Sequence, residues 1–456
     1  MQHPLEQELR STLSLAAIFA FRMLGLFMIL PIFAIAAKDY SSASPALIGI
    51  ALGGYGLSQA LLQVPFGLLS DRLGRKPILI AGLILFALGS LVGGLATSIY
   101  GLILGRIMQG AGAIGSTIMA TMADLTKVEN RTKAMAAIGL TVGLSFSVAL
   151  ILGPLFYRYI GLGGIFTLTA VLALVGILIV IFVIPRPPQL LKPHRTESVL
   201  QQFAKTLRNP ELLRLDYGIF ILHTLLTACF VALPPMLQST GMTLSHQWQF
   251  YLPILVCAFI GMLPFMLIAD RYQQQKPILL GAIATLLLSL LGLYLWHATR
   301  WDFTVALIGF FTAFSLLEAI LPSMVSKIAP IHSKGAALGV YSSSQFLGIF
   351  FGGTTAGLVQ SLWHPETVFV YCAILAASWL LIAAFMCKPL HLETKILPLK
   401  ALKPEDASDF EQKLSTIRGI IETTILLEHG IAYLRVDNTI LDKSALLRTT
   451  QAFIRD

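Results

Sequence analysis

The chain has 456 residues, of which 56% are hydrophobic and only 12% are charged. Soluble domains carry about 25% charged residues, so this composition excludes a single soluble globular protein, and its apolar content excludes a disordered one. The net charge of +9 indicates either an anionic partner such as nucleic acid or the excess of Lys and Arg that orients a membrane protein.

Twelve apolar stretches follow one another along the chain, and each is long enough to cross a bilayer as a helix of about 20 residues. They lie at about 12–37, 46–70, 77–97, 99–122, 133–157, 163–184, 215–238, 248–268, 277–297, 302–326, 334–360 and 367–387. We therefore expect an all-α polytopic membrane protein with twelve transmembrane helices. The first stretch is expected to be a retained span and not a cleaved signal peptide.

Lys and Arg are concentrated in every second loop between these stretches. Loops rich in these residues stay on the cytoplasmic side. We therefore expect a multi-pass protein of the inner (plasma) membrane with both termini in the cytoplasm. The excess of positive charge is then a topology signal, and nucleic acid is not an expected partner.

A long polar loop at 185–214 follows the sixth span and contains Pro185, Pro187, Pro188 and Pro193. It is expected to be a cytoplasmic linker between an N-terminal six-helix half, 1–184, and a C-terminal six-helix half, 215–388. The tetrapeptide Lys-Pro-Ile-Leu at 76–79, where span three begins, recurs at 276–279, where span nine begins. Internal repeats of this kind are typical of transporters that rock two halves about a site near the middle of the membrane.

The composition changes after Lys388, where acidic and basic residues become frequent and balance each other. The pattern indicates a strand, a helix, two strands and a second helix, an order typical of a ferredoxin-like fold. We expect residues 394–456 to form a small α+β ferredoxin-like cytoplasmic domain with a regulatory role. This segment has no cysteine and no basic face, which argues against metal carriage and nucleic-acid binding.

The segment 67–77, between spans two and three, carries the most specific signal and reads Gly-Leu-Leu-Ser-Asp-Arg-Leu-Gly-Arg-Lys-Pro. Gly67 and Asp71 are one helical turn apart and share a face. Gly67 lets another helix approach closely, Asp71 can meet the positive N-terminus of a helix, and Gly74 permits a tight turn. The loop also places three positive charges at the membrane surface: Arg72, Arg75 and Lys76.

This segment is similar to the loop signature of the major facilitator superfamily, whose members are built from two six-helix halves. The segment 104–113, with Arg106 and Gln109 at matching positions, resembles the fourth-helix motif of that family. Gly153-Pro154 in span five resembles the core of the motif of drug:proton antiporters, although the glycines expected after the proline are replaced. Nearly the whole chain, including its C-terminal domain, resembles the YajR-like transporters of the superfamily.

The resemblance implies a secondary transporter that works by alternating access, needs no cofactor and uses the proton gradient as its energy source. It implies that Asp71 docks on the start of span eleven, around Ser333, in the outward-facing state. It also implies that Arg75 pairs with Asp124 at the end of span four, where Arg131 can join them. Such a cluster would hold the cytoplasmic side shut until protonation or substrate binding changes the balance between states.

Ionisable side chains inside spans are costly, about 2.5–3.5 kcal/mol each at a helix centre, and therefore need a reason. Arg22 and Arg106, the latter with its neighbour Gln109, are candidates for proton coupling or substrate attraction, or else for structural donors to free carbonyl groups. Glu318 lies deep in span ten, where apolar surroundings favour the protonated carboxyl group and suit a proton carrier. His223 in span seven can titrate near neutral pH. The alternative for both is a hydrogen bond between helices.

These observations favour proton-coupled efflux of a small amphipathic or sugar-like compound by a monomer embedded in the lipid bilayer. An uptake symporter stays open because the motif in span five is incomplete. A membrane sensor acting through its C-terminal domain is less favoured, since a sensor needs no alternating access. The chain has no nucleotide-binding or hydrolase motif and no cysteine pattern typical of a metal site, so we expect neither an enzyme nor a metal.

Overall fold

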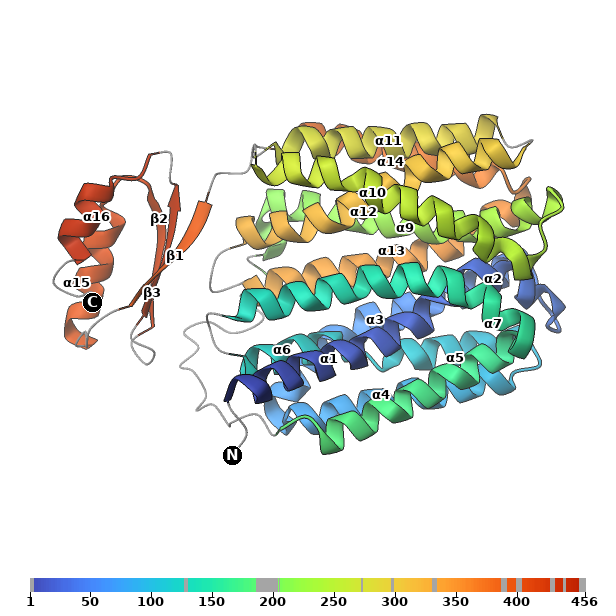
Figure 1. Ribbon diagram of the computed structural model, residues 1–456, viewed down its shortest axis with the longest axis horizontal. Helices are drawn as coiled ribbons and strands as arrows, with labels where there is room; N and C mark the ends of the chain where they lie inside the picture. The colour runs from blue at the N-terminus through green and yellow to red at the C-terminus, as the bar shows by residue number, and fades with distance from the viewer. Residues whose placement is uncertain are drawn as a thin grey trace.

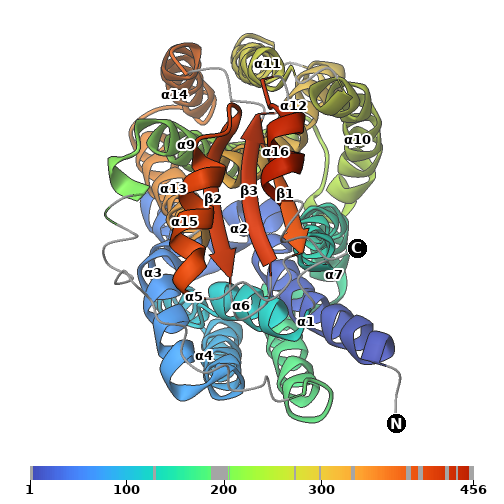
Figure 2. The same cartoon turned by 90° about the vertical axis from the view of Figure 1, so that its left-hand side faces the viewer.

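The computed structural model describes residues 4–126, 130–185, 204, 206–271, 274–296, 299–329, 334–386, 392–398, 404–426, 431–437 and 440–450. Long helices run side by side along one axis, and a small domain containing a sheet lies beyond one end of them (Figure 1). We call that end of the bundle the tail-side end and the opposite end the far end. Figure 2, seen from the tail side, shows the sheet in front of the helix ends.

The first half of the bundle contains helices that alternate in direction along the chain. They are α1 (Pro4–Phe27), α2 (Leu30–Ala36), η1 (Ala37–Asp39), α3 (Pro45–Leu73), α4 (Arg75–Leu95), α5 (Ile99–Ala111), α6 (Gly115–Leu125) and α7 (Arg131–Phe182). Side-chain caps begin two of them at the far end, because Ser44 accepts from Leu47 N–H and Ser98 from Gly101 N–H, both at 3.3 Å.

The second half repeats this pattern. Its elements are α9 (Pro210–Ser239), η3 (Leu244–His246), α10 (Gln247–Arg271), α11 (Gln275–Leu295), α12 (Arg300–Ile328), α13 (Lys334–Leu362) and α14 (Thr367–Ala384). Asn209 caps α9, and Thr299 with Asp302 forms a capping box at the start of α12. Most of the predicted linker, 185–214, lies outside the described residues.

Ten helices among the described residues are long and apolar enough to cross a membrane. Two features of the structure bear on the difference between these ten helices and the twelve spans expected from the sequence. The chain of α7 folds back on itself at the far end (Figure 1), where Gly161 has φ of 65° and non-helical geometry, so a single helical element contains two apolar stretches. The other feature is α13, a glycine-rich helix of 29 residues that is not among the ten.

The two halves meet most closely where α13 of the second half packs against α3 of the first half. Glycines make this approach possible on the far half of both helices. A Cβ atom added at Gly53 would lie 2.6 Å from the carbonyl oxygen of Phe350, and one at Gly357 would lie 2.6 Å from that of Pro45. Only residues without a side chain allow two helix backbones to come this close.

The small domain has a core of its own, formed by residues such as Phe410, Leu414 and Leu434. Its elements are β1 (Leu392–Pro398), α15 (Pro404–Ser415), β2 (Ile420–Leu426), β3 (Ile431–Asp437) and α16 (Lys443–Thr450). The strands form an antiparallel sheet in the order β1-β3-β2, and both helices lie on the same face of it (Figure 2).

Candidate functional site

The loop motif brings three helix ends together at the tail-side end. Gly74 has φ of 95° and turns the chain directly from α3 into α4, which begins at Arg75. The Arg75 guanidinium donates to Asp71 at 2.5 Å and to Asp124 at 2.8 Å, and also to the hydroxyl oxygen of Ser70. Arg75 and Asp124 are mostly buried, with 17% and 20% of their side chains exposed. This cluster therefore ties α3, α4 and α6 of the first half to one another.

Other residues of the predicted gate lie around this cluster. A Cβ atom added at Gly67 would lie 3.1 Å from the hydroxyl oxygen of Ser116, so Gly67 allows α6 to approach α3 closely. Arg72 is exposed to solvent. The side chain of Arg131 and all of Ser333 lie outside the described residues, and the expected docking of Asp71 on Ser333 stays a prediction.

The repeated lysines act alike in the two halves, which the sequence did not predict. Lys76 Nζ lies 3.4 Å from the carbonyl oxygen of Ile181, near the end of α7. Lys276 Nζ donates to the carbonyl oxygens of Ala384 and Met386, at 2.9 and 2.6 Å, at the end of α14. A lysine at this position neutralises carbonyl groups that have no partner within their own helix. The repeat therefore caps the last long helix of each half.

Arg22 lies buried inside the first half with 1% of its surface exposed. Its Nη2 donates to the side-chain oxygen of Gln59 at 2.8 Å and to the hydroxyl oxygen of Tyr55 at 3.2 Å. The chain of hydrogen bonds continues from Gln59 to Gln63 at 3.0 Å, and from Gln63 to Ser342 of α13 at 2.6 Å. The network therefore runs from the interior of the first half to the interface between the halves.

Arg106 of α5 is fully buried inside the same half. It donates to the side-chain oxygen of Gln109 at 3.1 Å and to the carbonyl oxygen of Leu52 at 3.4 Å, and its guanidinium lies 4.9 Å from the ring centre of Tyr55. Gln109 in turn donates to Ser90 at 2.8 Å. The two predicted residues Arg106 and Gln109 therefore contact each other, and they link α3, α4 and α5.

Glu318 and His223 come together in the second half through a residue that sequence reasoning missed. Gln345 of α13 donates to His223 Nε2 of α9 at 2.8 Å and to a carboxylate oxygen of Glu318 of α12 at 3.3 Å. His223 Nε2 lies 3.8 Å from the other carboxylate oxygen. His223 is buried, whereas 26% of the Glu318 side chain is exposed. The bond from the Gln345 amide makes His223 Nε2 an acceptor, as it is in one tautomer of a neutral imidazole.

Aromatic rings close the interface beside this group. Phe146 of the first half lies 5.7 Å from Phe314 and 6.2 Å from Phe311 of the second half, measured between ring centres. Phe27 packs against Phe146 at 5.2 Å, and His223 packs against Phe314 at 5.9 Å. Aromatic pairs contribute about 0.5–1.5 kcal/mol each beyond their buried area. They hold the two halves together in the middle of the bundle.

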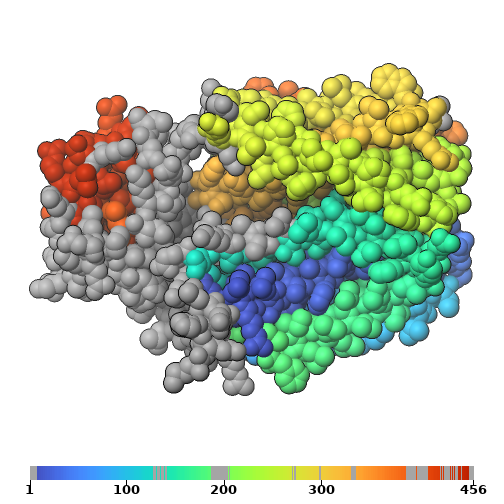
Figure 3. Space-filling view, viewed as in Figure 1, coloured from blue at the N-terminus to red at the C-terminus, as the bar shows by residue number. Residues whose placement is uncertain are grey.

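The tail-side end is more open than the far end. Figure 3 shows a hollow in the surface between α10 and the first part of α7 at the tail-side end. Near the start of α13, a Cβ atom added at Gly335 would have no described atom within 4 Å. At the far end, in contrast, α3 and α13 are in backbone contact. The observed conformation is therefore closed at the far end and opens towards the tail side.

Gly153 and Pro154, the predicted motif of span five, are buried in α7. A Cβ atom added at Gly153 would lie 3.3 Å from the Cα atom of Met28, where the chain passes from α1 to α2. The glycine thus allows α7 to pack directly on the break in the first span. Its close neighbours are backbone atoms of Met28, between α1 and α2.

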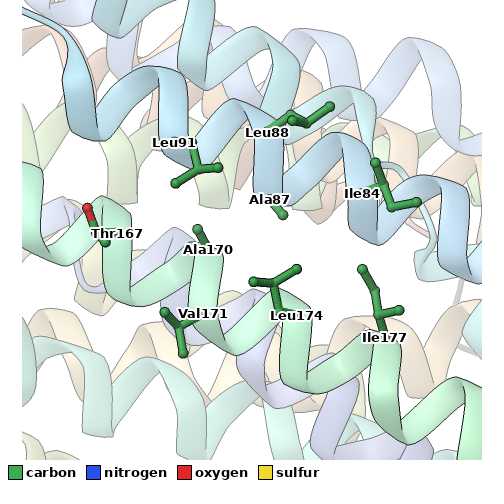
Figure 4. A pocket seen from close by; sticks show the side chains of 9 residues that line it. All are labelled: Ile84, Ala87, Leu88, Leu91, Thr167, Ala170, Val171, Leu174 and Ile177. Carbon is green, nitrogen blue, oxygen red and sulfur yellow. The ribbon is translucent and has the colours of Figure 1, made fainter.

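A separate apolar groove of about 180 Å³ lies between α4 and the second part of α7. Its side chains face one another across the two helices (Figure 4), and Thr167 is the one that carries a polar atom: Ile84, Ala87, Leu88, Leu91, Thr167, Ala170, Val171, Leu174 and Ile177. None of the predicted site residues lines it. Such a surface suits a lipid acyl chain and offers little to orient a polar ligand.

Metal chemistry has no support in the described part of the chain, where no group of three or more His, Cys, Asp or Glu side chains could hold an ion. Buried ionisable groups lie instead in both halves of a helical bundle, and the network of Arg22 reaches Ser342 in the second half. This arrangement is that of a membrane transport protein.

The comparisons with known proteins agree with this class. The model of the Major Facilitator Superfamily matches residues 15–352 and, in a second match, 218–427. The chain is 40% identical over 438 residues, or 96% of both chains, to the inner membrane transport protein YajR of Escherichia coli. The chain therefore belongs to the Major Facilitator Superfamily, as its motifs predicted, and members of this family are membrane transporters and not enzymes.

Two further similarities are more distant. The multidrug resistance protein MdtM of Salmonella typhimurium is 29% identical over 282 residues, which are 57% of this chain and 64% of that one. A solved bacterial homologue of the human lysosomal transporter Spinster, in an inward-facing and occupied conformation, matches with a TM-score of 0.66 and 16% identity. It covers 82% of this chain and 96% of its own, and it shares the fold.

Proposed function

We propose that this chain is a proton-coupled transporter that exports a small amphipathic or sugar-like compound by alternating access, acting as a monomer. The observation that carries the proposal is the group formed by Glu318, Gln345 and His223. The Glu318 carboxylate is partly exposed, accepts a hydrogen bond from Gln345 and lies beside the buried imidazole of His223. A carboxylate so placed can take up a proton in one conformation and release it in the other.

The topology we propose has twelve transmembrane helices in two halves, 1–184 and 215–388, joined by a cytoplasmic linker at 185–214. The fold-back of α7 at Gly161 and the length of α13 support this number, because each adds one span to the ten. The tail, 394–456, would be a cytoplasmic ferredoxin-like domain, which the sheet order β1-β3-β2 supports. Cysteine labelling from each side of inverted and right-side-out vesicles tests this topology at Ser361 and Ser415.

With the tail in the cytoplasm, the observed conformation is open to the cytoplasm. We propose that Asp71, Arg75 and Asp124 form the cytoplasmic gate, with Gly67, Arg72, Gly74, Lys76 and Arg131 supporting it. The sequence led us to expect that pairing of Arg75 with Asp124 holds the cytoplasmic side shut. Both residues and Asp71 lie in the first half, so we propose instead that Arg75 bonded to two carboxylates stabilises the inward-open state. Asp71 would leave Arg75 for the start of α13 when the tail-side end closes. Arg106 and Gln109 would support proton coupling from the first half.

Two observations bear on the direction of transport. Similarity to MdtM, whose name describes multidrug resistance, and the Gly153-Pro154 motif favour export. The missing glycines after Pro154 favour uptake by symport as the second candidate.

The test is reconstitution of the full chain in liposomes that contain a pH-sensitive dye, followed by addition of pools of small compounds. Proton movement opposite to a compound supports antiport, and parallel movement supports symport. In the same assay, Glu318→Gln tests the proposed proton carrier. Its matched control is Glu366→Gln, which removes a carboxylate at the start of α14. Absence of proton movement with every pool would overturn the proposal.

A further inference from the structure

Arg22 is a buried cation without a described counter-ion. It carries a full positive charge with 1% of its surface exposed, yet no carboxylate in the described part of the chain lies within ion-pair distance. Its Nε and Nη1 atoms also have no hydrogen-bond partner there. Removing a charge from water without a compensating partner is strongly unfavourable. A protein keeps such an arrangement where a ligand supplies the missing charge.

The fourth predicted span is broken beside this arginine. α5 ends at Ala111 and α6 begins at Gly115, with non-helical geometry at Gly112 and Ile114. The first hydrogen bond of α6 runs from Ile118 N–H to Ile114, so the amides before it have no acceptor within the helix. A half-helix that starts within the membrane presents a partial positive charge.

Arg22 and the start of α6 face the same pair of amide side chains. Gln59 accepts from Arg22 and, at its other end, Nε2 lies 3.9 Å from where a Cβ atom of Gly115 would be. Gln63 Oε1 lies 3.7 Å from the same point, and the ring of Phe19, one turn before Arg22 on α1, lies 3.8 Å from it. The start of α6 and Arg22 therefore share Gln59 as a neighbour.

A second buried polar group without a described partner lies in the first turn of α6. The hydroxyl of Thr117 is fully buried and has no hydrogen-bond partner among the described residues. Arg106 differs from Arg22 in one atom. Each arginine makes two described hydrogen bonds and one ring contact, Arg106 with Tyr55 and Arg22 with Phe86, but Arg106 leaves only Nε without a partner, whereas Arg22 leaves Nε and Nη1. Arg22 therefore leaves two donor atoms without a described partner, and Thr117 in the first turn of α6 leaves one.

We propose that Arg22 and the N-terminal turn of α6 bind an anionic group of the transported compound, and that this group is a carboxylate. One guanidinium and one half-helix together balance a single negative charge better than the double charge of a phosphate. The site is reached through Gln59 and Gln63, since Gln63 is bonded to Ser342 at the interface between the halves. A carboxylate that enters from the hollow displaces this bond and takes the open donors of Arg22.

This inference rests on the proposed function, and one experiment separates the two. Full-length protein in dye-loaded liposomes is given matched pairs of a carboxylate and its neutral amide: benzoate and benzamide, glutarate and glutaramide, gluconate and gluconamide. Wild type is expected to move protons with at least one carboxylate and not with its neutral partner. Arg22→Gln is expected to reduce this movement about 10- to 100-fold, because a hydrogen bond to a charged group is lost.

Arg22→Lys keeps the charge and is expected to retain part of the movement. Arg158→Gln removes an exposed arginine from the far end and is expected to behave as wild type. Proton movement with a neutral compound and with no carboxylate would overturn the anion site and leave the transporter in place. Equal responses of Arg22→Gln and Arg158→Gln to the carboxylate would also overturn it. Absence of movement with any compound would overturn both proposals.

Discussion

The contact between α3 and α13 at the far end gives a prediction with a defined size. A Cβ atom at Gly53 would lie 2.6 Å from the carbonyl oxygen of Phe350, whereas ordinary contacts begin at 3.4 Å. In Gly53→Ala, α13 must therefore retreat by roughly 0.8 Å, since atoms this close repel steeply. Overpacking of this kind costs about 1–3 kcal/mol. The cost applies in the state whose far end is closed, and it shifts the balance between states about 5- to 150-fold.

The assay measures the distance across the far end with spin labels on cysteines introduced at Thr97 and Ser361, in a background without native cysteines. Both positions are exposed at the far end, one in each half. Gly53→Ala is expected to populate a longer distance. Gly143→Ala is the control, because its Cβ atom would have no described atom within 4 Å. Identical distance distributions in the two variants would refute the reasoning.

Three further predictions concern single side chains. Arg75→Gln should lower the thermal unfolding temperature more than Arg72→Gln, because it removes the ion pairs that Arg75 makes with Asp71 and Asp124, at a cost of about 1–3 kcal/mol; equal temperatures would contradict this. Lys276→Met should destabilise the protein by about 1 kcal/mol, because it leaves the carbonyl groups at the end of α14 without their partner. Lys38→Met, at the exposed far end, should not destabilise it. Thermal unfolding of the two variants measures the difference. Gln345→Leu should lower proton-coupled flux about tenfold, since it removes the amide between Glu318 and His223, while Gln360→Leu on the same helix should leave flux near wild type.

The parts of the fold that depend on local sequence could be predicted. Apolar length is sufficient to indicate a membrane span, and the strand and helix order of the tail follows from short-range patterns. The pairing of Arg75 with Asp124 could be inferred only through the resemblance, since 48 residues separate them. The break at Gly112 between α5 and α6 could not be predicted, because glycines in a span are compatible with a continuous helix.

Contacts between distant segments could not be predicted, because they depend on how helices pack and not on the local sequence. Glu318 and His223 were each candidates, but nothing local to either indicates that Gln345 joins them. A single glutamine in an apolar helix has no distinctive pattern. Lys276 was found through the repeat, yet its role depends on α14, more than 100 residues further along the chain. Such roles follow from packing between helices.

The central claim is that Glu318 carries the coupled proton. The most direct measurement compares two modes of transport in liposomes containing Glu318→Gln, with a compound identified in the dye assay. The glutamine keeps the size and the hydrogen-bonding ability of the side chain, but it cannot release a proton. Exchange of labelled for unlabelled compound at equal pH should therefore persist, whereas flux driven by a pH gradient should disappear. Gradient-driven flux at the wild-type rate in Glu318→Gln would contradict the account.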